Sequence, residues 1–253
     1  AGQWSHPVYI AAESDPLVTL YVEGKAKLKL HVPKNAEPAG PKTPDSDAHL
    51  HIVTPDHTAV DELWKARRRR DGSLEAHSHN RVDLLGPGIG RGGARAYGGS
   101  ALGGLIRKGE LGSGIHHALA LALPRRHQRR GHIWPASGED DNAKADYTGH
   151  VPMGQLITLP KELDLSTLGL SKGTLAIAKA LKEYGAYDVD SASDLSFYAE
   201  PAVEPELVAV REDLGKLKPY LRCVKNNLPE RRGGGGTFLV PLAPGLLQKS
   251  SKK

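Results

Sequence analysis

The sequence has almost no cysteine, few aromatic residues and no long apolar run. Cys223 is the only cysteine among 253 residues, so the chain can form no internal disulfide and no cysteine-rich zinc site. Any bound metal would need histidine and carboxylate ligands. No segment approaches the roughly 18 consecutive apolar residues of a membrane helix. We therefore expect a soluble protein that does not use the membrane as a partner.

The scarcity of aromatic residues also bears on the fold. Aromatics make up 5% of the chain, against 29 glycines and 18 prolines, which favours short elements joined by turns. Hydrophobic residues, at 39%, are sufficient for a core. We expect a mainly β protein: a single-domain β-sandwich or jelly-roll-like body over residues 1–245, with one or two short helices. Residues 246–253 are expected to form a basic tail.

The start of the sequence lacks a basic region followed by an apolar one. The chain opens at Ala1 instead of methionine, which suits a mature protein whose signal peptide has been removed and equally suits a trimmed chain.

Positive charge is concentrated in two clusters. The net charge is +5, and the arginine-rich stretches are 67–70 (RRRR) and 125–130 (RRHQRR). Such clusters attract polyanions such as an acidic polysaccharide, unless their arginines pair with nearby acids on a solvated surface. Because no aromatic residues are interleaved with them, we do not expect nucleic acid as a partner. The oligomeric state is left open.

Periodicity predicts several elements. Alternation predicts a hairpin over residues 17–32 that turns at Glu23 and Gly24, and further strands at 49–53, 132–138 and 153–159. The clearest helix follows Ser171, a suitable cap, and a shorter helix is expected over 204–214. Residues 84–113 form a glycine-rich loop, and a last strand follows the glycine run 233–236.

Two H-x-H pairs are the first candidates for chemistry. They are His49 with His51 and His77 with His79, and in a strand each pair would share a face, as metal ligands must. H-x-H resembles half of the cupin signature, but the first glutamate after His51 is the distant Glu62. The sequence leaves open whether either pair binds metal, and we predict no metal site and no cofactor.

Other motifs point elsewhere. The glycine-rich loop lacks the lysine and hydroxyl residue of a phosphate-binding loop, and no G-x-S-x-G nucleophile motif is present. Carboxylates are more suggestive, because a glycosidase needs one protonated and one ionised carboxyl about 5–9.5 Å apart. Each aspartate could instead cap a turn. The candidates are Asp45, Asp47, Asp56, Glu62, Asp188, Asp190 and Asp194.

A series of short motifs resembles a family of secreted bacterial and fungal proteins that carry no assigned activity. The motifs are GIHHAL at 114–119, WPA at 134–136, PMG at 152–154 and ALKEYG at 180–185, followed by Asp190 and Ser193; the similarity spans residues 4–220. The chain reads DSAS at 190–193 where the family usually has D-N-G-S, and its arginine and glycine insertions are longer. The resemblance implies a secreted β-sandwich that acts on polysaccharide.

The family pattern falls on Asp47, His117 and Asp190, and Glu62 adds a further carboxylate. The leading hypothesis is a glycoside hydrolase in which Asp47 and Asp190 are the carboxyl pair and His117 assists. A polysaccharide lyase acting on an acidic glycan, with His117 or Tyr184 as base, is one alternative. A non-catalytic carbohydrate-binding or matrix protein is the other.

Three residues are candidates for substrate binding: His116, Tyr184 and Trp134. In the alternating stretch HHALALALP, His117 would share a strand face with the leucines and His116 a face with the alanines. The small alanines suggest a groove with room for a glycan, next to His116. We nevertheless favour His117 for catalysis, because the first residue of a strand lies at the sheet rim.

Overall fold

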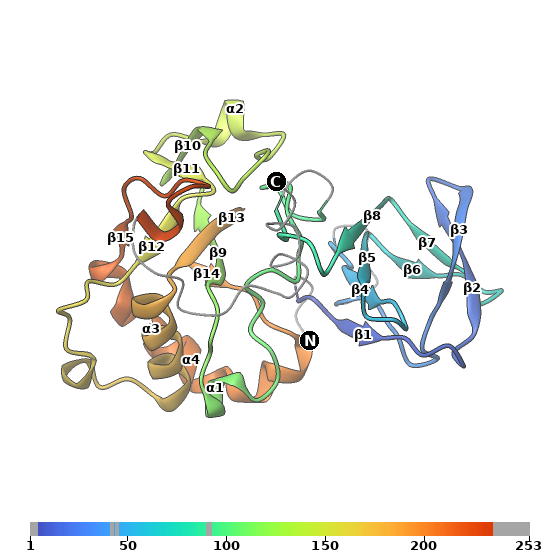
Figure 1. Ribbon diagram of the computed structural model, residues 1–253, viewed down its shortest axis with the longest axis horizontal. Coiled ribbons are helices and arrows are strands. Elements are labelled where there is room, and N and C mark those ends of the chain that lie inside the picture. The colour runs from blue at the N-terminus through green and yellow to red at the C-terminus, as the bar shows by residue number, and fades with distance from the viewer. Residues whose placement is uncertain (1–4, 41–42, 44–45, 90–92, 235–253) are drawn as a thin grey trace, which may run out of the picture. The chain divides into compact units, whose positions relative to one another are not determined.

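The computed structural model describes residues 5–40, 43, 46–89 and 93–234, and it is mainly β, as predicted (Figure 1). The chain divides into two compact units, the first within residues 1–94 and the second within residues 95–242. Each unit has a hydrophobic core of its own. A single domain over 1–245 stays a prediction, and the expected tail lies outside the described residues.

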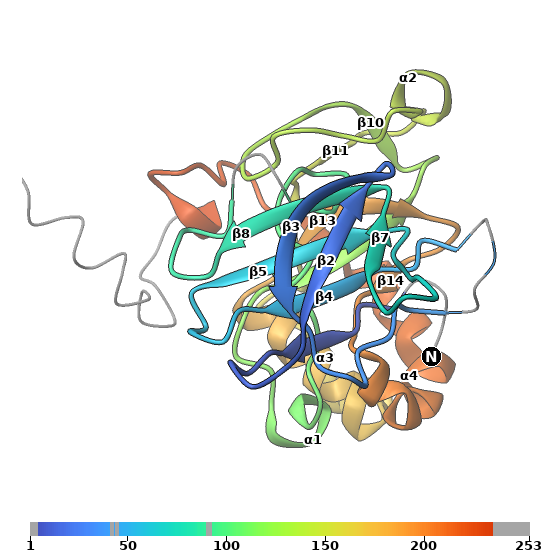
Figure 2. The same ribbon diagram turned by 90° about the vertical axis from the view of Figure 1, so that its right-hand side faces the viewer.

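The first unit consists of two four-stranded sheets that share one core. Members of both sheets, among them Leu20, Leu50 and Leu74, are fully buried in a single cluster. The predicted hairpin is confirmed, with Glu23 and Gly24 at its turn in positive-φ conformations. One sheet has the order β1 (Val8–Ile10), β4 (Leu50–Val53), β5 (Ala59–Trp64), β8 (Ser78–Asp83); the other has the order β3 (Lys25–His31), β2 (Leu17–Val22), β7 (Leu74–Ala76), β6 (Arg67–Arg68). Figure 2 shows strands of both sheets, β4, β5 and β8 of one and β2 and β7 of the other.

The second unit is built on a mixed five-stranded sheet. Its order is β14 (Ser196–Phe197), β9 (Leu119–Pro124), β13 (Ala186–Ala192), β12 (Leu156–Thr158), β15 (Arg222–Cys223), and a separate pair joins β10 (Gln128–His132) to β11 (Val151–Met153). Its helices are α1 (Glu110–Ser113), α2 (Ala143–Asp146), α3 (Lys172–Glu183) and α4 (Val208–Asp213), with short 3₁₀ segments at Leu165–Leu168, Pro201–Glu206, Leu214–Tyr220 and Arg232–Gly234.

Helix α3 forms where the sequence predicted a helix. The Ser171 side chain accepts a hydrogen bond from the Thr174 backbone amide at its start, and Ile177 and Leu181 are buried against the sheet. The second expected helix is shorter than predicted, because residues 201–206 form a 3₁₀ segment and only α4 is α-helical. Among the described residues, no helix is long and apolar enough to cross a membrane.

Strand β9 corrects the expectation of a groove. All six of its residues are buried: Leu119 and Leu121 pack into the cluster that includes α3, and Ala120 packs into a second cluster with Tyr97 and Met153. The alanine face is therefore covered by protein. The strand also begins at Leu119, two residues later than the alternation suggested.

Two predicted strands differ from the structure. Residues 133–138 turn at a cis Trp134–Pro135 peptide bond instead of extending, and the stretch 153–159 is divided between the end of β11 and β12. The strand expected after residue 236 lies outside the described residues.

Candidate acid–base site and histidine cluster

The predicted catalytic residues are divided between the two units. Asp47 and Glu62 belong to the first unit, and His117 and Asp190 belong to the second. Asp47 and Asp190, the proposed carboxyl pair, therefore do not belong to one compact unit.

In the first unit, Asp47 and Glu62 are held by structural contacts. The indole Nε1 of Trp64 donates a hydrogen bond to Asp47 Oδ1 at 3.0 Å. Glu62 lies in the middle of β5, fully buried, and its Oε2 accepts a hydrogen bond from the Ala94 backbone amide at 2.8 Å. Both carboxylates therefore have a role in the local fold, whatever else they do.

In the second unit, His117 and Asp190 lie toward opposite ends of the parallel pair β9 and β13. His117 precedes β9, whereas Asp190 is paired with Ala122, so about 16 Å of strand separates them at roughly 3.3 Å per residue. The His117 ring instead contacts the Glu110 carboxylate at 3.2 Å and the Ala118 carbonyl at 2.9 Å. His117 is thus part of a local contact with Glu110, the first residue of α1.

The three predicted substrate-binding residues have different environments. His116 is exposed, and Tyr184 ends α3 and packs against the hydrophobic core beneath it. Trp134 is half-buried; its ring makes an edge contact with Tyr187 on β13, and the guanidinium of Arg232 lies over it. Trp134 thus contacts β13, the strand that carries Asp188 and Asp190.

Asp188 is at the centre of the acidic group in the second unit. Its side chain is fully buried, and Gln128 Nε2 contacts both of its carboxylate oxygens at 3.2 and 3.0 Å. Burial raises the pKa of Asp188 well above its ordinary value, the charges of Asp190 and Asp140 raise it further, and the Gln128 hydrogen bond opposes the rise. Asp188 is therefore protonated under conditions in which an ordinary aspartate is ionised.

The same group includes the half-buried Asp190 and a tyrosine–aspartate pair. The Gln128 amide that contacts Asp188 also donates a hydrogen bond to the Asp190 carbonyl at 2.9 Å. The Tyr147 hydroxyl donates a hydrogen bond to Asp140 Oδ2 at 2.6 Å, and burial, together with this carboxylate, holds the pKa of Tyr147 above its ordinary value. We call Asp140, Asp188 and Asp190, with Gln128 and Tyr147, the acidic cluster.

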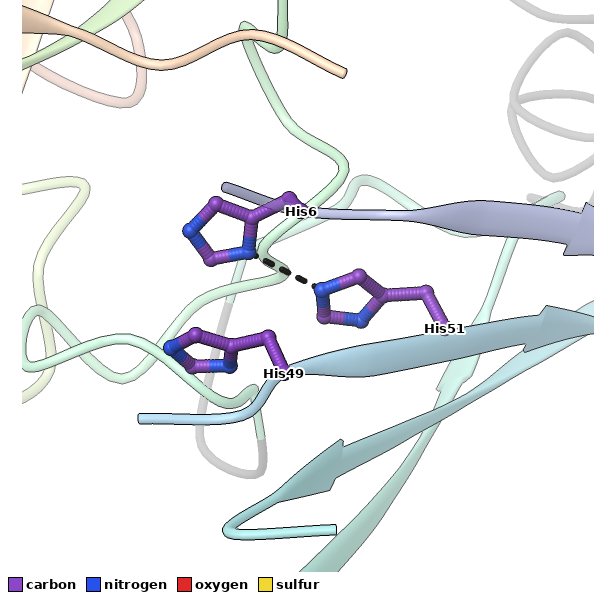
Figure 3. Close-up of side chains that lie close together, drawn as sticks. All are labelled: His6, His49 and His51. Carbon is purple, nitrogen blue, oxygen red and sulfur yellow. Dashed lines mark hydrogen bonds between the residues drawn. The ribbon is translucent and has the colours of Figure 1, made fainter. Parts of the chain in front are cut away.

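Three buried histidines converge in the first unit (Figure 3). One H-x-H pair, His49 and His51, is joined by His6, and one ligand nitrogen from each residue lies within 4.8 Å of the other two. Among the described residues, no other group of three histidine, cysteine or acidic side chains has this geometry. These residues could hold a metal ion.

The second H-x-H pair does not converge on a third ligand. His77 is exposed and contacts the edge of Trp64, whereas the His79 Nε2 atom lies 2.7 Å from Asp61 Oδ1, on the neighbouring strand β5. The two residues thus have separate local partners.

The arginine clusters are partly neutralised by nearby acids. Arg67 makes two hydrogen bonds to the Glu75 carboxylate, at 3.1 and 2.8 Å, and Arg125 pairs with Asp146 at 2.9 Å. This arrangement fits a solvated surface better than a platform for a polyanion.

Two hollows, one with a volume of about 200 Å³, lie in the first unit, and of the candidate carboxylates Asp56 lines the first of them. One of these hollows includes Asp61, the partner of His79.

Sequence reasoning missed the importance of Asp188 and His6. Asp188 was among the candidate carboxylates, but its burial depends on the packing of Gln128, which is distant in sequence. His6 is an isolated histidine, and only the pairing of β1 with β4 places it beside His51.

Comparison with family models, with curated proteins and with solved structures found no match to this chain.

Proposed function

We propose that this protein is a secreted hydrolase that cleaves polysaccharide chains by acid–base catalysis in the acidic cluster. Asp188 is the proton donor and Asp190 is the second, ionised carboxyl. The observation that carries the proposal is the buried Asp188 carboxyl, with its raised pKa, two residues from the half-buried Asp190. A buried carboxyl with a raised pKa, close in the chain to a second carboxyl, is a candidate for the proton donor that glycoside hydrolysis requires.

The surroundings of the cluster support these roles. Gln128, itself fully buried, contacts the Asp188 carboxyl through an amide that also donates a hydrogen bond to the Asp190 carbonyl, and so links the two proposed catalytic residues. Tyr187, the chain neighbour of Asp188 on β13, makes an edge contact with Trp134, and aromatic rings supply the flat apolar surface on which a sugar ring can pack. The polysaccharide substrate and the secretion are inferred from the family resemblance.

The proposal is tested by incubating the protein with plant, microbial and algal polysaccharides and analysing the products by mass spectrometry. Asp188→Asn and Asp190→Asn should each lower turnover by about 100- to 10,000-fold, the usual contribution of a general acid or base. Asp194→Asn is the matched control, because Asp194 lies on the same segment but pairs at the surface with Lys218; this variant should keep its activity.

The other outcomes identify the alternatives. Products that absorb as unsaturated sugars would indicate a lyase, and binding without any product would indicate a carbohydrate-binding protein. Loss of activity in Asp47→Asn, with activity retained in Asp188→Asn, would contradict the proposal.

A further inference from the structure

The two faces of strand β4 differ in chemistry. Leu50 and Ile52 point into the apolar core of the first unit, so the alternation of a strand places His49 and His51 on the opposite face. Yet both histidines are also buried, at 7% and 0% exposure. A buried face made of imidazoles is costly unless its polar atoms are satisfied together.

The third histidine is brought in by strand pairing. Strands β1 and β4 are parallel, with Val8 beside His51, and the His51 amide donates a hydrogen bond to the Pro7 carbonyl at 3.0 Å. His6, which is 2% exposed, precedes β1 and therefore lies beside the end of β4 from which His49 and His51 project (Figure 3). Backbone pairing positions His51, and His6 and His49 lie next to the ends of the paired strands.

The distances between the rings suit a shared ion. His6 Nδ1 and His51 Nε2 are 2.9 Å apart, and the ring centroids of His6 and His49 are 4.3 Å apart. Two nitrogens bound to one tetrahedral Zn²⁺ at 2.0–2.1 Å are separated by about 3.3 Å. The ligand nitrogens of the three histidines lie within 4.8 Å of one another. A pair at this upper limit would have to approach by about 1.5 Å to bind one zinc ion, which side-chain rotation can supply.

A buried carboxylate lies next to the cluster. Glu62 is directly opposite His51 in the antiparallel pairing of β4 and β5, so the two side chains share the same face of the sheet. Glu62 is fully buried. Its negative charge would compensate part of the charge of a divalent cation held by neutral imidazoles.

We infer that the first unit binds one divalent transition-metal ion, Zn²⁺, through His6, His49 and His51. Imidazole nitrogen is a preferred ligand of Zn²⁺, whereas Ca²⁺ and Mg²⁺ take oxygen ligands. Three protein ligands leave a fourth position for water, as in zinc sites that carry out chemistry. This site does not depend on the acidic cluster, which belongs to the second unit.

The test is a binding measurement on the full chain. The protein is treated with a chelator, exchanged into metal-free buffer near neutral pH and titrated with zinc chloride in a calorimeter, and the bound zinc is counted by elemental analysis. We expect one equivalent per chain and a rise in melting temperature on addition of the ion. Replacement of Zn²⁺ by Co²⁺ should give the visible absorption of a four-coordinate nitrogen site.

His6→Asn and His49→Asn are the informative variants, because they lie outside the strands, whereas His51→Ala risks unfolding β4. Each should weaken zinc binding by about 100-fold or more, since even indirect partners of a metal contribute 10- to 100-fold. His77→Ala, from the other H-x-H pair, is the matched control and should bind zinc like the parent. Circular dichroism of each variant verifies the fold.

Two results would overturn the inference: less than stoichiometric zinc on the folded parent protein, or unchanged affinity in folded His6→Asn and His49→Asn. Neither result depends on glycan cleavage, so the metal site and the proposed function fail independently.

Discussion

Gly154, the glycine of the PMG motif, allows a direct test of how the second unit is packed. Its φ is +88°, and a Cβ added there would lie 2.1 Å from the Ile133 carbonyl oxygen and 2.9 Å from the Cβ of Ala136. Its amide donates a hydrogen bond to the Asp188 carbonyl at 2.7 Å. The backbone therefore has little freedom to move away, and Gly154→Ala must displace the WPA turn.

The magnitude follows from two contributions. A left-handed conformation costs an alanine roughly 1–2 kcal/mol, and forcing a methyl group into a filled site costs about 1–3 kcal/mol more. Gly109, in the same unit, has φ +90° but no atom within 4 Å of an added Cβ. Gly109→Ala should therefore lower the free energy of unfolding by the first contribution alone, and Gly154→Ala by about 2–5 kcal/mol.

Urea unfolding followed by far-ultraviolet circular dichroism measures both variants. The difference between them isolates the steric contribution, and in a chain of this size it corresponds to several degrees in melting temperature. Equal destabilisation of the two variants would refute the reasoning, because it would mean that the contact with Ile133 and Ala136 relaxes without cost.

The remaining predictions concern pH. The pKa of Asp188 is raised in the folded protein. As pH rises above about 4, Asp188 therefore loses its proton in the unfolded state before it does so in the folded state, and the free energy of unfolding decreases as pH approaches 7. Asp188→Asn cannot ionise, so urea unfolding at about pH 5 and pH 8 should show this variant gaining stability relative to the parent at the higher pH; a pH-independent difference would exclude the buried acid. The pKa of Asp56 is lowered to about 2, chiefly by the Thr54 hydroxyl, which donates to Oδ1 at 2.5 Å. Asp56 therefore stabilises the fold above its unfolded pKa of 3.8, and this contribution is lost as pH falls toward 2. In Thr54→Val, a carboxyl NMR titration should give an Asp56 pKa closer to 3.8; a value that stays near 2 would assign the shift to Thr58.

The motifs that carry the family resemblance take on a structural meaning in the second unit. Gly154 of PMG packs against Ala136 of WPA and is hydrogen-bonded to Asp188, which follows ALKEYG on the chain. The PMG and WPA motifs therefore meet next to the strand that follows ALKEYG. Their spacing in sequence reflects a packing requirement as much as any chemistry.

Local sequence determined the secondary-structure elements that depend on interactions between residues close together in the chain. Alternation and the Glu23–Gly24 turn specified the first hairpin, and Ser171 with the apolar face of Ile177 and Leu181 specified α3, because capping and amphipathicity act over a few residues. The mainly β class followed from the composition, through many turns and few aromatics.

Tertiary structure alone decided which side chains meet. The residues near Asp188 in the sequence do not predict that Gln128 will cover it, and the residues near His6 do not predict that β1 will pair with β4. The alanine face of β9 looked open because alternation reports only that two faces differ, not what covers each one. Burial and convergence depend on contacts between residues far apart in the chain, and it is these contacts that created both the raised pKa of Asp188 and the histidine cluster.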